Sequence, residues 1–220
     1  MIITEGRIEN VLLRGLGILV VSLLFPSCSK SIFKSKWTRE EAPPSFQARF
    51  ETSKGSFDIE VKREESPHAV DRVYQLIKHH FYDHSIFYRG DSNFVVQFGS
   101  SDTVKSNYWS QHKIPDETLV NGNVRGGVSF ARAGKETRGT ELFINLKDNP
   151  FLDTLSFEGV KGFPVFGNVI RGMDVVASIY VGYGDRTMDE LDTLYRNRPR
   201  FLQLFPKLDL INKAYLLQSK

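Results

Sequence analysis

The sequence predicts a mainly β domain, built as an antiparallel barrel or sandwich. Apolar and polar residues alternate with period two on both sides of Ser53-Lys54-Gly55, and further apolar runs of strand length follow between turn-forming residues. Phe and Tyr are frequent, with 17 and 8 copies in 220 residues. Alternation and aromatic enrichment are typical of half-buried strands. The length suits one domain of ordinary size with extensions at its ends.

The N-terminal part has a different composition. Residues 15–25 form an apolar run behind Arg14, and Pro26-Ser27-Cys28 follows. Such a run is too short to cross a bilayer as a helix and fits the core of a signal peptide. We therefore expect residues 1–27 to be a lipoprotein-type signal peptide and Cys28, the single cysteine, to carry the lipid. An ordinary signal peptide or an uncleaved anchor is the alternative. Residues 28–45 are expected to form a tether.

The regular structure is expected to begin with a β-hairpin and a helix. Strands over 46–51 and 56–62 follow from the alternation around the Ser53-Lys54-Gly55 turn. A helix is expected from Ser66-Pro67, because Ser suits the N-cap and Pro the first helical position. An apolar stripe at helical spacing continues from there to Phe81.

Five more strands are expected along the rest of the domain. Their apolar runs cover residues 86–88, 94–98, 127–131, 142–146 and 164–169. A short helix is expected from Gly172 to Ile179. Residues 186–220 form a charged extension, in which the apolar positions between Leu208 and Leu216 predict a helix docked on the domain. A helix that binds a partner is the alternative.

Charge and residue spacing exclude several classes of function. The net charge is +3 and no basic run is present, so binding to nucleic acid has little support. The five histidines lack the spacing of metal ligands, and we expect no metal and no cofactor. His79-His80 is expected on a solvated helix surface.

Seven short motifs follow one another between residues 46 and 185. They are Ile86-Phe87-Tyr88-Arg89, Phe94-Val95-Val96-Gln97-Phe98-Gly99, Ile114-Pro115-Asp116-Glu117, Phe130-Ala131-Arg132-Ala133-Gly134, Gly139-Thr140-Glu141-Leu142-Phe143-Ile144, Phe151-Leu152-Asp153 and Phe163-Pro164-Val165-Phe166-Gly167. In this order they resemble the cyclophilin family of peptidyl-prolyl cis-trans isomerases. The resemblance implies an eight-stranded antiparallel β-barrel capped by two helices, here with a C-terminal helical tail, and a groove on its outer face that binds X-Pro peptides.

The resemblance also implies the residues of the site. The catalytic residues would be Arg89, Gln97 and Phe143, and the substrate would be bound by Phe94, Val95, Ala131, Arg132, Glu141, Phe151, Leu152 and Phe163. Rotation about an X-Pro bond is slow because the nitrogen shares its lone pair with the carbonyl. A cation that donates to this nitrogen in the twisted state favours the transition state, and Arg is always charged.

Several positions depart from the family pattern. Glu141 stands where Gln is usual, Phe151 and Phe163 replace a frequent Trp and His, and Phe98 replaces a Gly. An ionised Glu only accepts hydrogen bonds, so it would oppose a peptide carbonyl or draw Arg89 away. We therefore expect Glu141→Gln to raise kcat/KM. A polar loop at 90–93 adds to these departures, and they leave open a catalytically weak module that binds Pro-containing segments.

The sequence thus predicts an isomerase that acts on exported X-Pro-containing polypeptides. Residues 46–185 would form the isomerase domain and residues 186–220 a C-terminal extension. The protein is expected to be a monomer in the bacterial cell envelope, with Cys28 anchored in a membrane and the domain outside the cytoplasm.

Overall fold

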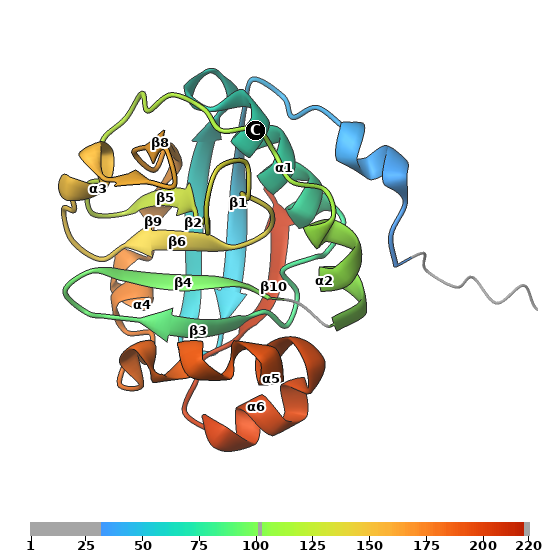
Figure 1. Ribbon diagram of the computed structural model, residues 1–220, viewed down its shortest axis with the longest axis vertical. Helices are drawn as coiled ribbons and strands as arrows, with labels where there is room; N and C mark the ends of the chain where they lie inside the picture. The colour runs from blue at the N-terminus through green and yellow to red at the C-terminus, as the bar shows by residue number, and fades with distance from the viewer. Residues whose placement is uncertain (1–31, 101–102, 218–220) are drawn as a thin grey trace, which may run out of the picture. The chain divides into compact units, whose positions relative to one another are not determined.

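The computed structural model describes residues 32–100 and 103–217, which are built around one eight-stranded antiparallel sheet (Figure 1). Its order is β10-β1-β2-β9-β5-β6-β4-β3. The strands are β1 (Ser45–Thr52), β2 (Gly55–Lys62), β3 (Ile86–Gly90), β4 (Val95–Ser100), β5 (Gly127–Phe130), β6 (Leu142–Asn145), β9 (Val165–Arg171) and β10 (Ile211–Leu216). The two edges meet through a bridge between Ile86 and Leu210. This closure confirms the predicted eight-stranded barrel.

Aromatic side chains fill the barrel. Phe50 of β1 and Phe57 of β2 form a cross-strand pair with ring centroids 5.0 Å apart. Phe98 is 1% exposed and packs on Phe87, with ring centroids 5.1 Å apart. The residue that replaces a glycine of the family therefore belongs to the core. Burying each large aromatic side chain contributes roughly 1.5–3 kcal/mol, so this cluster is a main stabilising element.

Helices cover the barrel, and α1 (Pro67–Lys78) is the longest of those described. Its predicted start is correct, and Ser66 occupies the N-cap position, but its side chain makes no capping hydrogen bond. The Ser66 hydroxyl donates to Glu117, and the Glu117 carboxylate accepts from the backbone N–H groups of His68 and Ala69 at 2.7 and 3.2 Å. The predicted short helix is α4 (Met173–Ala177). The structure adds α2 (Thr103–Ser110), α3 (Phe151–Thr154) and a small hairpin of β7 (Ser156–Phe157) and β8 (Val160–Lys161).

The C-terminal extension is helical only in its first half. In the structure it begins two residues earlier than predicted, with the 3₁₀ helix η3 (Gly184–Glu190), and continues through α5 (Leu191–Arg196) and α6 (Arg198–Leu204), which lie below β3 in Figure 1. The predicted helix over 208–216 is wrong, because this segment is strand β10, paired with β1. Ile211 and Ala214 are fully buried there. Pairing with β1 satisfies backbone groups that an open barrel edge would expose.

The segment before β1 packs on the domain. In the 3₁₀ helix η1 (Ser35–Arg39), Trp37 stacks on His79 with ring centroids 3.9 Å apart. Phe33, just before this helix, packs on Trp109 with ring centroids 5.2 Å apart. The described part of the expected tether is therefore attached to α1 and α2, and His79 is mostly covered. Residues 1–27 and Cys28 lie outside the described residues. No helix in the described part is long and apolar enough to cross a membrane. A third 3₁₀ turn, η2 (Arg63–Glu65), links β2 to α1.

Candidate active site

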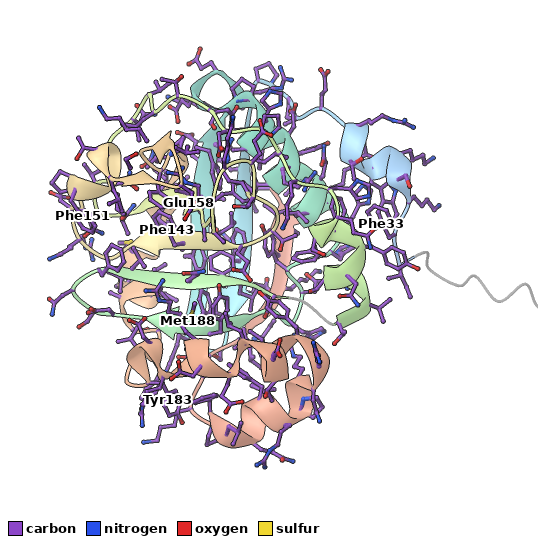
Figure 2. All side chains as sticks on the ribbon, viewed as in Figure 1. Phe33, Phe143, Phe151, Glu158, Tyr183 and Met188 are labelled. Carbon is purple, nitrogen blue, oxygen red and sulfur yellow. The ribbon has the colours of Figure 1, made fainter. Side chains whose placement is uncertain are left out.

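A groove of about 670 Å³ lies on the barrel between the β3–β6 strands and the C-terminal extension. Every residue expected in the site lines it except Phe151, which is half-exposed and stacks on Phe94 with ring centroids 5.5 Å apart. Figure 2 shows Phe151 at the rim of the domain and Phe143 over the sheet. The fold therefore brings together segments that are far apart in the sequence.

The floor of the groove is apolar. Val95, Phe143 and Leu152 are 3–5% exposed and form a small cluster separate from the barrel core. Phe94, Ala131 and Phe163 pack against this cluster and are only partly buried. Because the cluster is open on one side, it can take up an apolar ring of a ligand.

Hydrogen bonds from asparagines hold the aromatic rim of this floor. The Asn149 side chain donates to the backbone carbonyl of Phe94, and the Asn123 side chain donates to that of Phe163, both at 3.0 Å. Asn145 connects the two, because it donates to Asn123 and accepts from Asn149 at 3.1 and 2.8 Å. All three asparagines are buried. These asparagines were not predicted from the sequence, although an Asn at the end of an apolar strand is a signal of such a network.

Arg89 lies on β3 directly opposite Gln97 of β4. Its Nη1 donates to Gln97 Oε1 at 3.3 Å, and its Nε donates to Asp185 Oδ1 of η3 at 2.7 Å. The Arg89 side chain is 30% exposed. The guanidinium is therefore held from two sides at the edge of the groove.

Glu141 is bound by tyrosine hydroxyls. Tyr88 donates to Oε2 at 2.6 Å, Tyr195 of α5 donates to Oε1, and Gln97 Nε2 is 3.4 Å from Oε2. Burial and the charge of Glu141 raise the pKa of Tyr88 and of Tyr195, so both hydroxyls remain protonated donors. The carboxylate does not draw Arg89 away, since that side chain pairs with Asp185. The expected effect of Glu141 on the peptide therefore has no support in this geometry.

Two cations complete the lining. The Arg132 guanidinium lies 4.2 Å from the centre of the Phe163 ring, and its Nη2 donates to the Val160 carbonyl at 3.0 Å. Burial lowers the pKa of Arg132 and that of Lys113. Within the described residues, Arg132 Nε and Nη1 are buried and make no hydrogen bond. The Arg132 side chain thus lines the groove as a cation held by the Phe163 ring and the Val160 carbonyl.

The C-terminal extension supplies one wall of the groove through Met188, Leu191 and Tyr195. Met188 lies on the side of the extension that faces the barrel (Figure 2). These residues and Asp185 were not predicted from the sequence, because no motif covers them. Tyr88 stands next to Arg89 in the motif Ile86-Phe87-Tyr88-Arg89, and this position could have identified it as a neighbour of the site. No group of three metal-ligating side chains occurs among the residues described.

Known proteins with similar sequences are described as peptidyl-prolyl cis-trans isomerases. Residues 47–195 match the family described as cyclophilin type peptidyl-prolyl cis-trans isomerase/CLD. The chain is 34% identical over 131 residues to a peptidyl-prolyl cis-trans isomerase of Acinetobacter baylyi, covering 58% of this chain and 68% of that protein. It is 30% identical over 158 residues to peptidyl-prolyl cis-trans isomerase-like 3 of Mus musculus, covering 70% of this chain and 86% of that protein.

A solved structure shows the same fold. The crystal structure of a cyclophilin type peptidyl-prolyl cis-trans isomerase from Cryptosporidium parvum superposes with a TM-score of 0.53. The match covers 80% of this chain and 99% of that chain at 18% identity. At this identity the comparison concerns the fold, and the sequence matches carry the family.

Proposed function

The chain belongs to the cyclophilin-type peptidyl-prolyl cis-trans isomerase family, and we propose that it speeds rotation about X-Pro bonds in polypeptides exported from the cytoplasm. The observation that carries the proposal is the Arg89–Gln97 pair beside an apolar floor in one groove. The membership in the family gives the reaction, and the groove gives the residues that we assign to it.

The chemistry follows from the twisted transition state. When the X-Pro bond rotates, the proline nitrogen regains its lone pair and becomes a better hydrogen-bond acceptor. A guanidinium fixed beside this nitrogen donates more strongly to the twisted state than to either planar state, which is differential binding. Arg89 suits this role because it stays charged and its plane is fixed by Gln97 and Asp185.

Rotation also requires that one side of the bond is held. We assign the proline ring to the floor of Val95, Phe143 and Leu152, where burial of its apolar surface anchors it. Phe94 and Phe163 close the sides of this floor. Arg132 lies above Phe163 and lines the groove, and we assign its positive charge to the carbonyl oxygens of the peptide. In this proposal the chain's own side chains carry the reaction without a cofactor.

The site of action is part of the same proposal. The short apolar run before Ser27-Cys28 supports lipidation of Cys28. In this proposal the protein is a monomer, and the lipid holds it at a bacterial membrane with its domain outside the cytoplasm. Exported chains fold there, and X-Pro isomerisation takes tens of seconds without a catalyst. A membrane-held isomerase would act on these slow folding steps.

The test is isomerisation of an Ala-Pro peptide by the full chain in detergent. We expect the wild type to exceed the uncatalysed rate and Arg89→Ala to lose most of the excess, with the change in kcat rather than in peptide affinity. Unfolding by urea should be unchanged, because Arg89 lies at the groove edge. If the folded wild type gives only the uncatalysed rate, the protein is instead a module that binds Pro-containing segments.

A further inference from the structure

We propose that Asp185 is a positioning residue for Arg89 and that the C-terminal extension thereby forms part of the catalytic apparatus. This inference rests on the proposed role of Arg89. Asp185 lies in η3, beyond the motifs that carry the family resemblance. Its Oδ1 accepts from Arg89 Nε at 2.7 Å, a shorter hydrogen bond than the one of 3.3 Å that Arg89 donates to Gln97.

The backbone of β3 is shaped for this approach. Gly90 follows Arg89, and a Cβ atom at Gly90 would lie 2.4 Å from Cγ1 of Val181 and 3.1 Å from its Cβ. Gly90 is buried under this contact. The missing side chain lets the segment before η3 lie directly against the catalytic strand, and this places Asp185 beside Arg89.

The contact fixes the plane of the guanidinium. Arg carries five N–H donors in a rigid fork, of which the described residues use one at Nε and one at Nη1. Two acceptors on different atoms of a planar group define its orientation, and the donors at Nη2 remain for the substrate. A catalytic donor that is displaced by a small distance loses much of its effect on the transition state. Asp185 therefore acts on the rate through Arg89.

The same extension holds the other end of this network. Gln97 accepts from Arg89 and lies 3.4 Å from Glu141, which accepts from Tyr195 of α5. A continuous series of polar contacts thus begins at Asp185 and ends at Tyr195, both in the extension. The barrel supplies the middle of the series and the extension supplies both ends.

Asp185 itself contributes little to stability, which makes the inference testable. Its side chain is 76% exposed, and exposed ion pairs add little to folding. We expect Asp185→Ala to lower kcat about fivefold with KM and urea unfolding unchanged. Asp185→Asn keeps an acceptor oxygen and should retain most of the rate. Asp189→Ala, an exposed carboxylate of the same 3₁₀ helix, is the matched control and should behave as wild type.

Double substitution separates positioning from a general effect. In full-length Arg89→Ala protein, adding Asp185→Ala should cause no further loss, because Asp185 then has no group to position. Equal loss in both backgrounds, or full activity of Asp185→Ala, would overturn the inference. If Arg89→Ala itself keeps full activity, the proposed catalytic role of Arg89 fails first.

Discussion

At the scale of single residues, Glu141 gains a role that its position in the motif did not indicate. Both carboxylate oxygens accept hydroxyl groups, one from Tyr88 and one from Tyr195, so the side chain joins β3, β6 and α5. Buried acceptors that are satisfied in this way specify one arrangement of their neighbours. The replacement of the family's Gln by Glu is therefore explained by the extension rather than by the substrate.

Glu141→Gln tests this explanation. A Gln offers one acceptor oxygen and presents an N–H₂ group to a second hydroxyl donor, so one hydrogen bond is lost or weakened. We expect the free energy of unfolding to fall by about 1 kcal/mol and kcat/KM not to rise. Urea unfolding and the peptide assay measure the two quantities. A rise of kcat/KM at unchanged stability would restore the expectation that Glu141 opposes the peptide.

The tyrosines of this network predict how stability depends on pH. Because burial raises the pKa of Tyr88 and Tyr195, the folded state keeps protons that the unfolded state releases above about pH 10. Their contribution is complete below that value and is lost as pH rises toward the raised folded values. We expect urea unfolding to show a smaller loss of stability between about pH 8 and pH 11 in Tyr195→Phe than in wild type. Tyr108→Phe, which changes an exposed ring outside the network, is the control and should lose as much stability as wild type. Equal losses of stability in wild type and Tyr195→Phe would show that Tyr195 does not cause this pH dependence.

At the scale of elements, the sequence predicted seven strands correctly because alternation is a local signal. The hairpin of β1 and β2 and the strands β3, β4, β5, β6 and β9 all lie where apolar runs were found. The eighth strand, β10, was expected as a helix, since its apolar positions also fit helical spacing. Its true partner, β1, is far away in the sequence, so the choice between helix and strand was decided by tertiary pairing.

The part of the site that lies in local motifs was predictable from the sequence, as the strands were. Motifs located the floor and Arg89, because each motif lies within one strand or loop. Asp185 and Tyr195 reach the site from the extension, and no local pattern connects them with Arg89 or Glu141. The helix α2 was missed because its apolar residues show little helical periodicity. Local sequence patterns therefore do not predict contacts between distant segments of the chain.

The packing of α6 gives a prediction at this scale. Phe201 is fully buried in a cluster with Ile86, Tyr88 and Leu194, whereas Leu204 on the same helix is 37% exposed. We expect Phe201→Ala to lower the free energy of unfolding by about 3–5 kcal/mol and Leu204→Ala by less than about 1 kcal/mol. Phe201→Ala should also lower the isomerase rate, since Tyr88 packs on this cluster and binds Glu141. Chemical denaturation checks the first effect, and comparable losses for the two variants would show that α6 is not docked through Phe201.

At the scale of the whole molecule, the described structure forms one unit from Phe33 to Leu217 rather than a domain with loose ends. The extension closes the barrel through β10 and lines the groove through α5, and η1 packs on α1 and α2. A protein cut after residue 185 would lose the strand that covers β1. The groove that we propose as the active site is therefore built partly by the extension.

This packing bears on the proposed membrane anchor. With Phe33 attached to the domain, only residues 29–32 remain between it and Cys28. Such a segment can span at most roughly 17 Å, so the proposed lipid would be attached to the domain through a short link. We expect Cys28→Ser to move the protein from the membrane to the soluble fraction with its isomerase rate unchanged, because no groove residue is altered. Ser31→Ala is the control and should stay with the membrane. Mass spectrometry of the wild type should find more than one acyl chain on Cys28, because a single chain gives only weak attachment. A Cys28→Ser protein that remains in the membrane fraction with its first 27 residues intact would identify the apolar run as the anchor instead.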